Sequence, residues 1–230
     1  MERSSIIIIS SCSASKDDSV HIPSGSKIVT PSYYISNEEL RAKLINIRKD
    51  VFSDPKAQVG KNTTYAFDLY VRAGNAYKDI FKCNYNSLRD ALIRSNAIEW
   101  FFLSSGYGII HALEKAHKYQ AAFNYNIAHQ RGILYTAKLW NTILSKICDA
   151  IFSTFKPSMV YVFGSKDYTH FVKETEYWMI NRRIKIFEST GSSGARWISP
   201  ILNELVNTIL KDKIQIFNAK YNQKFIKERR

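Results

Sequence analysis

Cysteine is scarce in this sequence, and long apolar runs are missing. The three cysteines, Cys12, Cys83 and Cys148, are odd in number and widely spaced, with no Cys-x-x-Cys pair among them. This pattern favours neither a disulfide framework nor a zinc site, so we expect no metal and no cofactor. No apolar stretch approaches the roughly 18 residues that a membrane-spanning helix requires. The short Ile6–Ile9 run has no signal-peptide cleavage motif after it, so we expect a cytoplasmic protein without membrane contacts.

Acidic residues are few relative to basic ones. The 33 lysines and arginines outnumber the 20 aspartates and glutamates, which gives a formal net charge of +13 over 230 residues. A surplus of this size favours polyanionic partners, and we expect DNA, with RNA as the alternative nucleic acid. The 14 tyrosines and 4 tryptophans add surfaces on which bases can stack. The alternative also stays open, because many basic proteins bind no nucleic acid.

Apolar runs that are typical of buried strands alternate with stretches of helical periodicity. The predicted strands cover 5–10, 98–105, 158–165 and 184–189, and the predicted helices cover 37–52, 86–95, 132–155 and 199–212. A basic amphipathic helix is predicted for the tail, 212–230. The alternation predicts a single α/β domain with a mostly parallel central sheet flanked by helices. The long loop 19–36 is a possible lid.

A small polar loop follows each predicted strand. These loops cover 11–18, 104–108, 164–168 and 190–197. Because ligands bind outside the carboxyl ends of the strands in open α/β sheets, we expect the four loops to face one crevice.

The candidate catalytic residues lie in the first loop and in the segment "YAFDLY". Lys16 could hold a phosphate or act as an amine nucleophile. Asp17 could activate water or stabilise a cationic sugar, and the alternative is that both residues are solvated loop charges. Asp68 lies among apolar residues, where a carboxylate needs partners or a function unless it faces solvent from a helix. Cys12 is more typical of a small buried residue than of a nucleophile.

The candidate binding residues lie in the second and fourth loops. In the fourth loop, glycines precede a helix, whose free N–H groups can bind an anion, and Arg196 adds a phosphate-binding fork. The residues of this predicted phosphate site are Gly191, Ser192, Ser193, Gly194 and Arg196. The alternative is an ordinary strand-to-helix turn, since neither a P-loop nor a G-x-G-x-x-G motif is present. In the second loop, Tyr107 could stack on a base or pack inside a glycine-flanked turn.

Three short motifs stand out, in the loop 11–18 after the first predicted strand, in "FDLYVRAGNAYKDIF" (67–81) and in "SSGYGIIHALEKAHKYQAAF" (104–123). They resemble the bacterial peroxide-stress protein YaaA family, in the order that the family has them. The first is the first-strand loop, through Ser13, Ala14 and Lys16, without the family's proline. The second lies in "FDLYVRAGNAYKDIF", through Leu69, Tyr70, Gly74 and Tyr77. The third is in "SSGYGIIHALEKAHKYQAAF", through Ser105, Gly106, Tyr107, Gly108 and Tyr119, with Lys118 where proline is usual. Together they span roughly the first half of the chain.

The resemblance implies binding and protection of DNA. Proteins that are more distantly similar to this family include DNA glycosylases that act on modified bases in defence against phages. By this resemblance, the loops would receive a flipped nucleotide, with Tyr107 and Tyr119 shaping a base pocket. Tyr33 and Tyr34 of the loop 19–36 could then serve as a wedge or lid.

These observations lead to a functional prediction with two rivals. We expect a DNA-binding enzyme that cleaves the N-glycosidic bond of a modified base, with Lys16, Asp17 and Asp68 as its catalytic residues. The first rival is a non-catalytic protein that binds and shields DNA. The second is an enzyme that uses the same crevice for free nucleotides.

Overall fold

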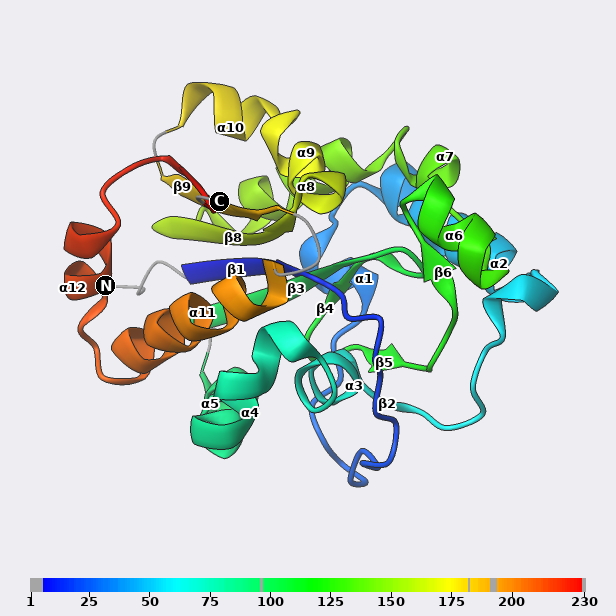
Figure 1. The fold of residues 1–230 in the computed structure, drawn as a ribbon, viewed down its shortest axis with the longest axis horizontal. Helices are drawn as coiled ribbons and strands as arrows, with labels where there is room; N and C mark the ends of the chain where they lie inside the picture. The colour runs from blue at the N-terminus through cyan, green and yellow to red at the C-terminus, as the bar shows by residue number, and fades with distance from the viewer. Residues whose placement is uncertain (1–5, 96, 182, 191–193, 229–230) are drawn as a thin grey trace.

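A largely parallel sheet forms the centre of the molecule in the computed structural model, which describes residues 6–95, 97–181, 183–190 and 194–228 (Figure 1). Within these residues the sheet has six strands in the order β10-β9-β8-β1-β3-β4. All neighbours are parallel except β3 and β4, which are antiparallel. Its strands are β1 (Ile6–Ser11), β3 (Ile98–Ser104), β4 (Gly108–His111), β8 (Met159–Ser165), β9 (Ile184–Ser189) and β10 (Phe225–Lys227). The predicted α/β class with a mostly parallel sheet is confirmed.

The central strands form because their side chains are β-branched or aromatic and are covered on both faces. Ile8 of β1 is fully buried, and it lies in register with Trp100 of β3 on one side and Tyr161 of β8 on the other. Strand β3 is buried along its whole length. Such continuous burial explains why these segments are apolar nearly throughout rather than alternating, and the buried Glu99 of β3 is paired with His111 at 2.7 Å.

Helices cover both faces of the sheet (Figure 1). One face is covered by α11 (Gly194–Leu210), which contacts β8 and β9 together with α4 (Lys78–Cys83) and α5 (Tyr85–Arg94). The other face is covered by α8 (Leu144–Phe155) and α9 (Lys166–Lys173). The remaining helices are α1 (Pro31–Tyr34), α2 (Glu38–Ser53), α3 (Ala66–Val71), α6 (Tyr125–Arg131), α7 (Ala137–Trp140), α10 (Glu176–Ile180) and α12 (Ile214–Lys220), with 3-10 turns η1 (Pro55–Ala57) and η2 (Asn75–Tyr77).

Two small ladders stand outside the central sheet. Strand β2 (Thr64–Tyr65) pairs with β5 (Lys115–Ala116), and β6 (Ala121–Ala122) pairs with β7 (Leu134–Tyr135). The second ladder joins the two ends of the segment that contains α6. This segment, 120–135, lies beside the loops that follow β1 and β8.

The helix predicted over 132–155 is interrupted. Its first residues form β7, and a turn separates α7 from α8. The turn follows Trp140, whose indole N–H donates to the carbonyl oxygen of Ser105 at 3.0 Å. This tertiary bond fixes the buried Trp140 side chain against a distant segment, and the periodicity of the sequence does not reveal it.

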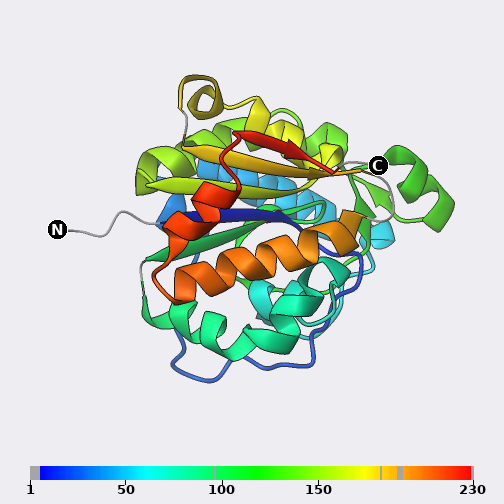
Figure 2. The same cartoon turned by 60° about the vertical axis from the view of Figure 1, so that its left-hand side comes forward.

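The tail also differs from the predicted continuous basic helix. Among its described residues only α12 is helical, and after a bend the chain forms β10, which pairs parallel to β9 and becomes the edge of the sheet (Figure 2). The backbone groups of β9 offer hydrogen bonds that an isolated amphipathic helix lacks. Helix α11 begins earlier than predicted, so Pro200 lies inside the helix rather than in its first turn.

None of the helices in the described ranges is both long enough and apolar enough to cross a bilayer.

Candidate active site

Two hollows open at the carboxyl ends of the parallel strands. They lie where β1 and β8 run side by side, and the chain leaves these neighbours in opposite directions, from β1 to β3 and from β8 to β9. In open α/β sheets, ligands bind at such switch points. The topology alone therefore makes this edge of the sheet the expected location of a ligand site.

The first hollow, which we call the lysine hollow, encloses about 190 Å³. It is lined by the loop after β1 with Lys16, by the segment 120–133 and by residues 165–168 after β8. The second, the serine hollow, encloses about 270 Å³ and is lined by 11–15, by Asn75 and Ala76 and by the region around the start of α11. The two hollows share Cys12, Ser13, Ala14 and Ser165. The predicted crevice is thus divided in two by the loop after β1.

Lys16 is the one cation of the first loop, and it lines the lysine hollow. Its Nζ lies 4.1 Å from the centroid of the Tyr119 ring and donates a long hydrogen bond of 3.5 Å to the carbonyl oxygen of Ala14. Across the described ranges, no salt bridge involves this side chain. Burial lowers the pKa of Lys16, and the nearby Cys12 thiol opposes that change to a smaller extent. The neutral, nucleophilic amine is therefore more populated near neutral pH than in an exposed lysine.

Neutral phenols lie beside this hollow: Tyr168 lines it, Tyr119 lies against Lys16, and Tyr70 contacts Tyr119. The hydroxyls of Tyr70 and Tyr119 lie 3.2 Å apart, and the Tyr119 hydroxyl lies 2.7 Å from Oγ of Ser104. The Tyr168 hydroxyl lies 3.6 Å from Sγ of Cys12. Burial raises the pKa of Tyr70, Tyr119 and Tyr168 well above the usual value. These phenols keep their protons at neutral pH and can act only as hydrogen-bonding groups there.

The carboxylate that lines the lysine hollow is Asp167. It lies in the first turn of α9, directly after β8, and Nδ2 of Asn124 donates to it at 3.4 Å. The sequence placed Asp167 in the third loop but gave it no role. Its position immediately after a strand was the available signal.

The two carboxylates predicted to be catalytic lie outside both hollows. Asp17 accepts from Nε of Arg72 at 3.0 Å and from the backbone N–H of Ser19 at 2.9 Å, and these bonds, led by the one from Ser19, lower its pKa. Asp68 is buried on α3, where it accepts from the Tyr85 hydroxyl and pairs with Nε of Arg89 at 3.3 Å. Burial raises the pKa of Asp68, and its bonds to Tyr85 and Arg89 oppose that change. The structure therefore gives both residues structural partners and does not bring them together with Lys16.

The second loop supports the lysine hollow rather than lining it. Tyr107 is 5% exposed, its hydroxyl accepts from the backbone N–H of His117 at 2.7 Å, and burial raises its pKa to about 12. Ser105 donates to the carbonyl oxygen of Ala121 at 2.8 Å. Gly106 lies against the Tyr119 ring, where a Cβ atom would come within 2.6 Å of a ring carbon. The motif therefore positions Tyr119. Tyr107 lines a separate hollow of about 490 Å³ beside α2, so the stacking of a base on its ring stays a prediction.

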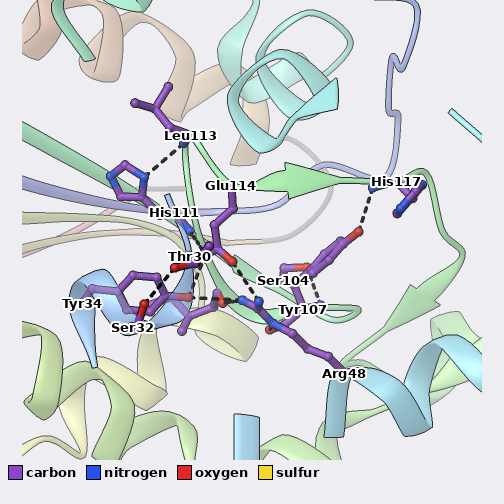
Figure 3. A network of polar contacts seen from close by, with 11 residues as sticks. Thr30, Ser32, Tyr34, Arg48, Ser104, Tyr107, His111, Leu113, Glu114 and His117 are labelled. Atoms are coloured by element: carbon purple, nitrogen blue, oxygen red, sulfur yellow. Dashed lines mark hydrogen bonds and ion pairs between the residues drawn. The ribbon is translucent and has the colours of Figure 1, made fainter. Parts of the chain in front are cut away.

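The loop 19–36 ends in a buried polar network rather than in a lid (Figure 3). The Tyr34 hydroxyl donates to Glu114 at 2.7 Å, and Glu114 also pairs with Arg48 at 2.9 Å. The Tyr33 hydroxyl donates to Glu99 at 2.8 Å. Tyr34 is fully buried, so its position does not support the predicted wedge or lid role. Tyr33 is 39% exposed, and the role predicted for it stays a prediction.

The fourth loop is described only in part. Gly191, Ser192 and Ser193 lie outside the described residues. Gly194 lines the serine hollow, and a Cβ atom there would come within 2.5 Å of Oγ of Ser189. Arg196 is exposed on the first turn of α11 and lines neither hollow.

No protein-family model matches this chain, and no curated protein matches it either. The candidate site therefore stands on its own geometry. Among the described residues, no group of three or more His, Cys, Asp or Glu side chains is placed to hold a metal ion.

Sequence reasoning missed one whole wall of the lysine hollow. That wall comes from the segment 120–133, which contributes Gln120, Asn124 and Arg131. Strands of two residues carry no readable periodicity, so the pairing of β6 with β7 was not visible. The absence of acidic residues from this stretch was the signal that could have found it.

Proposed function

We propose that this protein binds DNA and cleaves the N-glycosidic bond of a modified base in the lysine hollow. The observation that carries the proposal is Lys16, an amine with a lowered pKa that lines a hollow at the switch point of the sheet. An exposed lysine is protonated at neutral pH and is a poor nucleophile, whereas a desolvated one is activated. The resemblance to the YaaA family and to the proteins more distantly similar to it points in the same direction.

In the proposed reaction, the neutral Lys16 amine attacks C1′ of the target nucleotide. The C1′–N bond breaks, and the departing base takes its electron pair and a proton. The new ammonium loses a proton, and opening of the sugar ring leaves a Schiff base between Nζ and C1′. Water then hydrolyses this Schiff base, which frees the amine and leaves an abasic site.

Other groups of the lysine hollow would serve this reaction. Asp167 is the carboxylate that would accept the proton from the amine adduct and return it to the base. Gln120 offers an amide donor and acceptor for the edge of an extruded base, while the amide of Asn124 caps α6 and donates to Asp167. Arg131 at the rim and Arg196 on α11 are exposed cations that suit backbone phosphates.

Reductive trapping tests the proposal directly. The protein is incubated with oligonucleotides that carry unmodified, uracil, hydroxymethylated or glucosylated bases, with and without borohydride. We expect abasic sites on at least one modified substrate and a covalent protein–DNA product only when borohydride is present. Lys16→Ala should abolish both products, whereas Lys43→Ala, which removes an exposed lysine paired with Glu39 on α2, should retain them. Base release from no substrate, while DNA is still bound, would overturn the proposal.

The alternative is a DNA-binding protein without catalysis. It is favoured by exposed cations that line neither hollow, among them Lys211, Lys213 and Lys227. Under this alternative Lys16→Ala leaves DNA binding unchanged and no base is released from any substrate. Reversing the charge of the three tail lysines then weakens binding, and added salt weakens it steeply.

A further inference from the structure

Helix α6 and the chain on either side of it carry no acidic residue of their own, and the nearby carboxylate is that of Asp167 on α9, which accepts from Asn124 at the start of the helix. Between Glu114 and Asp149 the sequence contains five lysines and arginines and no aspartate or glutamate. The helix and the β6–β7 ladder beneath it project from one end of the molecule (Figure 2). A projecting segment whose own charged residues are all positive is complementary to a polyanion.

The same helix exposes aromatic and apolar side chains. Tyr125 is 61% exposed and Ile127 is 43% exposed. The Tyr125 ring is stacked with His129, with centroids 6.0 Å apart and planes at 27°, and it contacts the edge of Tyr135 at 5.5 Å. The protein thus holds one large aromatic ring in solvent, oriented by two neighbouring rings.

This surface is continuous with the lysine hollow. Ile127 and Arg131 of α6 line the hollow, while Tyr125 lies on the exposed part of the same helix. A chain that places one unit in the hollow can therefore continue over α6.

We infer that the α6 rim, made of Tyr125, Ile127, His129, Arg131 and Tyr135, binds a single-stranded stretch of nucleic acid beside the hollow. Aromatic faces for unpaired bases, combined with cations for the backbone, are the components of single-strand binding surfaces. A paired base hides its face inside the duplex, so stacking on Tyr125 selects unpaired nucleotides. The inference rests on the proposed function in one respect, namely that the strand on the rim is the one that delivers a nucleotide to the hollow.

Binding measurements separate this inference from the proposed catalysis. Fluorescence anisotropy is measured with a labelled single-stranded oligothymidylate and with a duplex of the same length. Tyr125→Ala should weaken single-strand binding about 10-fold, the loss of one stacked base, and should change duplex binding much less. Tyr125→Phe should retain binding because the ring remains. Ile180→Ala, at an 83% exposed position on α10, is the matched control and should have no effect.

Several outcomes would overturn the inference. These are unchanged single-strand affinity in Tyr125→Ala, or an equal loss for duplex and single strand. Sedimentation velocity provides a further test, because a wild-type dimer that becomes a monomer in Tyr125→Ala would make the rim a contact between two copies of the chain. Selective single-strand binding without any base release would contradict the proposed function and leave the rim intact.

Discussion

The Lys16 ammonium lies 4.1 Å from the centroid of the Tyr119 ring, in a hollow where the described residues offer it no salt bridge. The ring face stabilises the charged form, whereas burial destabilises it more strongly, so that the pKa of Lys16 is lowered. The protonation of the Lys16 amine is therefore intermediate between that of a fully hydrated lysine and that of a neutral, nucleophilic amine.

Lys16→Met should stabilise the protein at neutral pH. In the folded state Lys16 loses its proton at a lower pH than in the unfolded chain, so burying the charged form costs stability below that lowered pKa. This cost disappears as pH rises from the lowered pKa to the ordinary value of 10.5, because the unfolded state then binds more protons than the folded state. Urea unfolding at pH 7 and at pH 10 should show a gain in the variant that shrinks with pH. A gain independent of pH would contradict the lowered pKa.

Asp167→Asn and Asp17→Asn should have different effects on base release, because Asp167 lines the lysine hollow and Asp17 lies outside both hollows. Asp167→Asn should reduce base release, because the amide can no longer accept the proton of the amine adduct. Asp17→Asn should retain release, since Asp17 pairs with Arg72 outside both hollows. Its effect on the free energy of unfolding should be within about 1 kcal/mol, as for other partly exposed pairs. Single-turnover rates on one cleavable oligonucleotide decide the matter, and a larger loss in Asp17→Asn would reverse the assignment.

The sequence predicted the sheet and one side of the site for physical reasons that can be traced. Buried parallel strands require continuous apolar runs, so β1, β3, β8 and β9 could be found without knowledge of the fold. The polar loop after β1 followed directly, and Lys16 with it. The direction of a side chain, by contrast, depends on partners far away in the chain.

Asp17, Asp68 and Tyr107 show that limit. Arg72 lies 55 positions from Asp17, and Arg89 lies 21 positions from Asp68, so neither pairing could be deduced from local pattern. Tyr107 between two glycines is compatible with an exposed loop, yet its hydroxyl is held by the backbone of His117. The wall that Gln120 and Asn124 form was missed because it depends on long-range packing of very short strands.

Gly106→Ala should displace the Tyr119 ring on which the Lys16 side chain rests, which we call the Tyr119 platform. A methyl group at this position would lie 2.6 Å from the ring, so the ring or the backbone must move, which costs about 1–3 kcal/mol in a well-packed interior. The displacement also removes the support of Lys16, so trapping by borohydride should fall together with stability. Gly25→Ala is the control, since its φ is +75° but no neighbouring atom lies within 4 Å of the added carbon. It should cost only the backbone strain of about 1 kcal/mol and leave trapping unchanged. Equal effects of the two substitutions on trapping would argue against the platform.

Arg89→Ala should destabilise the fold by about 2 kcal/mol at neutral pH. The substitution leaves the buried Asp68 carboxylate with the Tyr85 hydroxyl and the weaker attraction of Arg72, and poorly compensated buried charges are costly. Burial already raises the pKa of Asp68, and loss of Arg89 should raise it further. The penalty should therefore decrease as pH falls through that raised pKa, because protonation removes the unpaired charge.

Urea unfolding between pH 4 and pH 8 measures this penalty, with Arg94→Ala, which removes an exposed arginine on the same helix, as the control. A penalty for Arg89→Ala that equals the control, or that stays constant with pH, would show that Asp68 does not depend on the pair. Base release at neutral pH should persist in the folded fraction of the variant, because Asp68 lines neither hollow.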